Sequence, residues 1–114
     1  MMKRTECRRI TPAEIAAKIP APNGDRFFVA LERGELQIEL YIPRGVDDQT
    51  PHRRDECYVI VEGEGKFEMR GEVVPFEAGD FFFVPAGVEH RFLDFGESMK
   101  TWVIFYGPDG GEQI

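Results

Sequence analysis

The sequence contains few of the residues that cross-link small secreted domains or bind nucleic acids. Its two cysteines, Cys7 and Cys57, are too few and too far apart for a disulfide framework or a zinc knuckle. Basic residues are in the minority, because 14 Lys and Arg stand against 21 Asp and Glu, a net charge of −7. Such a charge repels phosphate backbones and anionic lipid surfaces, so we expect no nucleic acid and no membrane as partner.

Long apolar runs are also missing. No stretch approaches the roughly 20 apolar residues of a membrane-spanning helix. The basic cluster at residues 3–9 is not followed by the apolar segment of a secretory signal. The sequence therefore predicts a cytoplasmic protein. Its 114 residues, 42% hydrophobic and 31% charged, are enough for one globular domain with a single core.

Helical periodicity is confined to one short stretch near the start. A capping box, with Thr11 as N-cap and Glu14 reaching back to it, predicts a helix over Ala13–Ile19. Because so short a helix is not stable alone, we expect it to dock on the main body through Ile15.

From residue 26 onward, apolar or alternating segments separated by Gly and Pro predict about eight short strands. They are Arg26–Glu32, Glu35–Ile42, Cys57–Val61, Lys66–Arg70, Glu72–Phe76, Asp80–Val84, His90–Phe95 and Lys100–Tyr106. Close spacing of this kind is typical of an all-β sandwich or barrel. We predict one domain over residues 1–114, with an N-terminal arm and helix at 1–25, a barrel at 26–107 and a tail at 108–114.

The chain has only two histidines, and both lie where a predicted strand begins. His90 starts one strand, and His52 lies just upstream of another. Glu56 follows His52 by four residues, which on a strand would place both side chains on one face. Two imidazoles and one carboxylate bind divalent first-row metals and leave positions open for water or substrate.

Two spaced motifs resemble those of the cupin superfamily. In the family's second motif, two glycines, a proline and a histidine recur at fixed intervals. Gly79, Pro85, Gly87 and His90 match them in register, and Asp94 takes the place of the motif's asparagine.

The family's first motif also has a counterpart here. It ends in a glutamate and, after six residues, a glycine, and Glu56 and Gly63 fit this spacing. Its His-x-His pair falls just before the glutamate. His52 takes the second position, while Thr50 occupies the first and Gln49 precedes it.

The resemblance implies an all-β, double-stranded β-helix (jelly-roll) cupin barrel with a short N-terminal helix. Cupins with a full site hold a metal with three imidazoles and a carboxylate. The resemblance therefore implies that His52, Glu56 and His90 bind Fe, Mn, Zn or Ni, weakly or not at all for lack of the third imidazole. The pocket candidates around them are Thr50, Gln49, Tyr58, Asp94 and Trp102. For Tyr58 and Trp102, filling the core is the alternative role.

The family includes isomerases, dioxygenases, decarboxylases, sugar-binding domains and storage proteins, so the resemblance assigns no reaction. One hypothesis is a metal-dependent protein that acts on or binds a small organic molecule in the lumen. The alternative is a non-catalytic binding or sensing module with a degenerate or empty metal site, and a third is a metal-free structural barrel. No residue stands out as an additional acid or base. Because apolar strands of cupins often build dimers, we also expect a homodimer.

Overall fold

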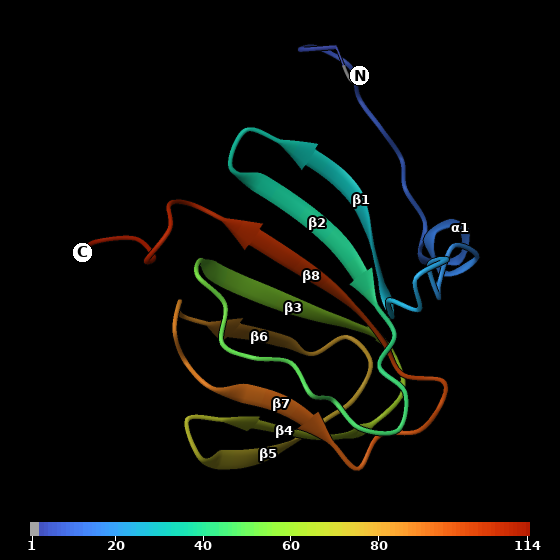
Figure 1. The fold of residues 1–114 in the computed structure, drawn as a ribbon, viewed down its shortest axis with the longest axis vertical. Helices are drawn as coiled ribbons and strands as arrows, with labels where there is room; N and C mark the ends of the chain where they lie inside the picture. Colours follow the sequence, from blue (N-terminus) through green and yellow to red (C-terminus); the bar gives the residue numbers. More distant parts are fainter. Residues whose placement is uncertain (1–2) are drawn as a thin grey trace.

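The computed structural model describes residues 3–114, which form one short helix and eight strands (Figure 1). The elements are α1 (Pro12–Ala16), β1 (Phe27–Arg33), β2 (Leu36–Tyr41), β3 (Asp55–Glu62), β4 (Gly65–Met69), β5 (Glu72–Phe76), β6 (Phe81–Val84), β7 (His90–Leu93) and β8 (Lys100–Tyr106). Within this range, no helix is long and apolar enough to cross a membrane.

The strands pair into two antiparallel sheets. The larger sheet has the order β1-β2-β8-β3-β6 and the smaller has the order β5-β4-β7. The predicted all-β class and short N-terminal helix are confirmed. The strand pairs of residues 3–114 form two separate sheets rather than one continuous ring.

The helix is shorter than its sequence predicts. The capping box is present, since Thr11 Oγ1 accepts a hydrogen bond from the Glu14 amide and Glu14 Oε1 accepts one from the Thr11 amide. The helix ends at Ala16, after which hydrogen bonds between residues three apart tighten the chain toward Ile19. Ile15 is buried against the outer face of the larger sheet, as expected.

The two faces of the larger sheet differ in what covers them. Leu40 of β2 is paired in register with Trp102 of β8, and both lie on the outer face against α1. The neighbouring pair, Glu39 and Val103, lies on the inner face that looks toward the smaller sheet. The apolar row of β2 therefore points outward to the helix, and its polar row points inward.

An aromatic core joins the two sheets. Tyr58 of β3, Phe67 of β4 and Phe92 of β7 are at most 1% exposed. Their ring centroids lie 4.4 to 5.4 Å apart. Truncating such a buried aromatic side chain to alanine costs about 3–5 kcal/mol. The core thus holds β7 rigidly against β3, and the first residue of β7 is His90.

Candidate metal centre

Three side chains from separate parts of the chain meet at one end of this core. They are His52 from the loop between β2 and β3, Glu56 from β3 and His90 from β7. Their potential ligand atoms all lie within 4.8 Å of one another, an arrangement that could hold a metal ion. Glu56 Oε1 lies 2.9 Å from His90 Nε2, and Glu56 Oε2 lies 3.7 Å from His52 Nε2.

The carboxylate in this cluster lacks ordinary partners. The Glu56 side chain is 1% exposed, and within residues 3–114 neither of its oxygens makes a hydrogen bond. His90 Nε2 is likewise buried without a hydrogen bond, and its 2.9 Å contact with Glu56 Oε1 is an ion pair only when the imidazole is protonated. Burying a carboxylate without donors costs several kcal/mol, and a cation bound between these atoms would offset that cost.

The spacing of the atoms suits a transition metal. Metal–ligand bonds of about 2.1 Å place neighbouring ligand atoms about 3.0 Å apart at right angles and about 4.2 Å apart across the ion. The contacts of Glu56 with His90 and His52, 2.9 and 3.7 Å, fall at or between these values. The remaining separation, between the two imidazoles, is at most 4.8 Å, so a small movement of the side chains lets all three residues bind one divalent ion.

Backbone contacts aim both imidazoles. His90 Nδ1 donates a hydrogen bond to the Val88 carbonyl oxygen at 2.8 Å, which leaves Nε2 to face the carboxylate. The turn before His90 contains Gly87 with φ of 81°, a conformation that favours glycine. The amide of this glycine donates a 2.8 Å hydrogen bond to the His52 carbonyl oxygen, so the two motifs hold each other in place.

The pKa values of the two imidazoles shift in opposite directions. Burial lowers the pKa of His90, but the Glu56 carboxylate and the Val88 carbonyl together outweigh it, so the pKa is raised. For His52, burial is the larger effect and lowers the pKa, although the nearby Glu56 carboxylate opposes it.

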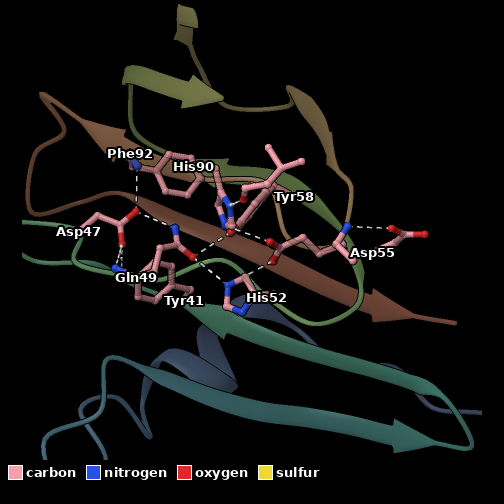
Figure 2. A network of polar contacts seen from close by, with 11 residues as sticks. Tyr41, Asp47, Gln49, His52, Asp55, Tyr58, His90 and Phe92 are labelled. Atoms are coloured by element: carbon pink, nitrogen blue, oxygen red, sulfur yellow. Dashed lines mark hydrogen bonds and ion pairs between the residues drawn. The ribbon is translucent and has the colours of Figure 1, made fainter. Parts of the chain in front are cut away.

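A buried carboxylate in the loop between β2 and β3 anchors this end of the molecule (Figure 2). Asp47 is 2% exposed. Its Oδ1 accepts hydrogen bonds from the Tyr41 hydroxyl at 2.7 Å and from the backbone N–H of Gln49 at 3.3 Å. Its Oδ2 accepts from the backbone N–H of Phe92 at 2.8 Å and from Gln49 Nε2 at 2.7 Å. One side chain thus ties the loop to β2 and β7.

Gln49 extends this network to the metal centre (Figure 2). Its Oε1 accepts a hydrogen bond from the Tyr58 hydroxyl at 3.0 Å and lies 3.1 Å from His52 Nε2. The network was not predicted as a unit. Asp47 carries no spacing signal, because its partner Phe92 lies 45 positions away in the sequence.

An open pocket of about 640 Å³ adjoins the cluster. Side chains of the inner face of β2, the loop and the core line it, among them Gln37, Glu39, Tyr41, Gln49, His52 and Tyr58. Burial, and then the charge of Glu56, raise the pKa of Glu39 to about 7. The sequence did not indicate Glu39 as a candidate acid or base, because only the covering of the opposite row by α1 turns this carboxylate inward.

The sequence itself matches a known family over this region. The profile of the family described as "Cupin domain" matches residues 37–105, which include His52, Glu56 and His90. The chain belongs to the cupin family. The site therefore lies in a cupin domain, and its three clustered residues are those that the two sequence motifs indicate.

Three relatives illustrate how far the similarity extends. An uncharacterised protein of Streptomyces coelicolor is 31% identical over 91 residues, 78% of this cupin chain and 87% of that protein. A cupin-2 domain containing protein from Shewanella frigidimarina is 26% identical with a TM-score of 0.60, covering 71% of this chain and 79% of that chain. A Cupin 2 conserved barrel domain protein from Salinispora arenicola shares the fold at 18% identity, with a TM-score of 0.69 over 90% of this chain and 91% of that chain.

The remaining pocket candidates of this cupin divide into two groups. Gln49 and Tyr58 lie beside the cluster, whereas the structure does not bring Thr50, Asp94 or Trp102 to it. Thr50 is exposed, and Trp102 packs on the outer face of the sheet.

Asp94 was predicted to lie near the pocket because it is four residues after His90, and the structure explains why it does not. Strand β7 ends at Leu93, and Asp94 adopts a φ of 52°, so the alternation that starts at His90 no longer applies to it. The Asp94 side chain is 71% exposed and lies 3.6 Å from Lys66 Nζ.

Proposed function

We propose that the protein is a metal-dependent cupin that binds a small, polar organic molecule beside the metal and acts on it. The buried Glu56 carboxylate, unsatisfied between two imidazoles, is the observation that carries the proposal. His52, Glu56 and His90 would hold the ion, with Fe, Mn, Zn and Ni as candidates. A divalent ion in such a site polarises an oxygen atom of its ligand.

The chain's own residues supply two further functions in this proposal. The polar inner row of β2 faces the pocket, so a ligand with several hydroxyl or carboxyl groups finds hydrogen-bond partners there. Glu39 is placed in the pocket wall with a pKa of about 7, which suits a group that accepts and returns a proton near neutral pH.

Metal titration of the metal-stripped protein tests the proposal. Isothermal titration with Mn²⁺, Zn²⁺ and Ni²⁺ is expected to show one site per chain in the wild type and none in His90→Ala. Asp94→Asn is the matched control, because it alters a motif position that lies outside the cluster and is expected to bind like the wild type. The proposal fails if no metal binds, or if His90→Ala binds as the wild type does.

A non-catalytic binding protein is the second candidate. It is favoured by the position of His52, whose side chain is 31% exposed on a loop, and by the missing third imidazole. Thermal-shift measurements with small polyols and hydroxy acids, with and without Mn²⁺, separate the two functions. Stabilisation without metal favours the binding protein, and metal-dependent stabilisation with product formation favours the enzyme.

We further propose a homodimer formed through the outer face of the larger sheet. Phe81 and Phe83 of the edge strand β6 are 60% and 45% exposed, an apolar surface that a second copy would cover. Light scattering is expected to give a dimeric mass for the wild type and a monomeric mass for Phe83→Asp. Val73→Asp, at another exposed apolar position on the smaller sheet, should remain dimeric. A monomeric wild type at micromolar concentration would refute the dimer.

A further inference from the structure

The metal centre has a fourth donor atom that the family motif does not predict. At the motif's first histidine position, Thr50 is exposed, while the preceding side chain, Gln49, turns inward. Gln49 Oε1 lies 3.1 Å from His52 Nε2. This is about the 3.0 Å that separates two neighbouring ligand atoms on one ion at bond lengths of about 2.1 Å.

The orientation of the Gln49 amide is determined by its neighbours. A carboxylate only accepts hydrogen bonds, so the amide atom 2.7 Å from Asp47 Oδ2 must be the nitrogen. The oxygen then faces the opposite way, toward the Tyr58 hydroxyl and His52. Because Asp47 is itself held by the backbone N–H of the buried Phe92, a chain of buried and partly buried hydrogen bonds directs the carbonyl oxygen of Gln49 at the cluster.

Metal binding would change what this oxygen contacts. Without metal, His52 Nε2 can carry a proton and donate a hydrogen bond to Gln49 Oε1. The same nitrogen must lose that proton to bind a metal, because only an unprotonated imidazole nitrogen has a lone pair to give. One lone pair of Gln49 Oε1 still accepts from Tyr58, and the other is then left facing the ion.

We propose that Gln49 is the fourth protein ligand, through Oε1, of the metal that His52, Glu56 and His90 bind. This inference rests on the proposed metal centre. It makes the donor set two imidazole nitrogens and two oxygens, where a full cupin site has three nitrogens and one oxygen. Carbonyl and carboxylate oxygens favour harder ions such as Mn²⁺, whereas imidazoles favour Ni²⁺ and Zn²⁺. An amide oxygen of Gln49 in place of the third imidazole therefore gives the site a higher preference for harder ions.

Two variants and one control test the proposal on the full chain. Gln49→Leu removes the oxygen at similar side-chain size and is expected to weaken Mn²⁺ binding at least about tenfold. Gln49→His supplies an imidazole and is expected to recover affinity, with Ni²⁺ and Zn²⁺ gaining more than Mn²⁺. Gln37→Leu is the same substitution on the wall that β2 contributes to the pocket, and it is expected to leave metal affinity unchanged. X-ray absorption of the Ni²⁺-loaded proteins should count two imidazoles in the wild type and three in Gln49→His.

The outcomes separate this inference from the metal centre itself. If the wild type binds metal, His90→Ala does not, and Gln49→Leu binds as tightly as Gln37→Leu, then Gln49 is not a ligand although the centre is real. If the wild type binds none of the three ions, both proposals fail. Thermal unfolding checks that the variants are folded. Should Gln49→Leu not fold, the imidazole count of Gln49→His decides, and a count of two overturns the inference.

Discussion

The backbone N–H of Gly87 donates a hydrogen bond to the carbonyl oxygen of His52, with 2.8 Å between the nitrogen and the oxygen. The bond connects the turn before His90 to the loop that carries the other imidazole. Gly87 has open space around it but a φ of 81°, so Gly87→Ala strains the backbone without a steric clash. We expect the variant to lose about 1–2 kcal/mol of unfolding free energy, measured by urea denaturation, and to bind Mn²⁺ more weakly.

Gly96 provides the matched control for this substitution. An added Cβ also meets nothing within 4 Å there, and its φ lies outside the left-handed region. Gly96→Ala is therefore expected to change the unfolding free energy by less than about 0.5 kcal/mol. Equal stabilities of the two variants would show that the turn at Gly87 carries no strain.

The carboxyl group of Glu39 gives the stability of the metal-free protein a defined pH dependence. Its pKa rises from 4.5 to about 7 on folding, so between these values the folded state binds more protons than the unfolded state. Stability contributed by this group is complete below pH 4.5 and is lost as the pH rises through 7. Glu39→Gln is expected to stabilise the protein at pH 8 by about 3 kcal/mol and to have little effect at pH 4.

Denaturation of Glu39→Gln and Glu72→Gln at both pH values checks this expectation. Glu72 is exposed on β5, so its substitution should leave the pH dependence of stability as in the wild type. The same small change for both variants at pH 8 would contradict an unfavourable charge at Glu39.

Asp47 is expected to be the polar residue whose loss damages the fold most. Asp47→Ala removes the acceptor of four hydrogen bonds, including that of the buried Phe92 amide, and should cost about 3–4 kcal/mol in urea denaturation. Tyr41→Phe removes one of the four donors and should cost about 1 kcal/mol. Similar costs for both variants would show that the carboxylate does not anchor the loop.

Metal binding should release protons in a pH-dependent manner. Because the pKa of His90 is raised, this imidazole is protonated over a wider pH range and must lose its proton before it can bind an ion. The pKa of His52 is lowered, so it competes with protons only at lower pH. Mn²⁺ affinity is expected to fall up to about tenfold per pH unit between pH 7 and 6. Titrations in buffers of different ionisation enthalpy count the protons, and a constant affinity over this range would contradict the assignment.

The local patterns predicted the strands well because each strand is bounded by Gly or Pro turns. Glu72–Phe76 and Lys100–Tyr106 have the predicted ends, and the ends of the other strands differ by at most two residues. The spacing of the two motifs likewise predicted which three side chains come together. The strand prediction depends on local sequence, and the prediction of the three clustered residues depends on fixed intervals between motif positions.

The remaining features of the site depend on tertiary structure. The direction of Glu39 depends on which row of β2 the helix covers, and Trp102 is directed away from the pocket for the same reason. The contact of Asp47 with Phe92 joins residues 45 positions apart. No periodicity in the sequence indicates such a contact. The hydrogen bonds by which Asp47 orients the Gln49 side chain are therefore visible only in the folded chain.

Both histidines of the chain lie in the cluster, and its only tryptophan packs on the other side of the sheet. In proton NMR spectra, every imidazole signal therefore comes from the metal centre without any need for mutagenesis. The fluorescence of Trp102 independently reports the outer surface where the helix docks. Occupancy of the site and integrity of the helix-covered face can thus be followed separately in the unmodified protein.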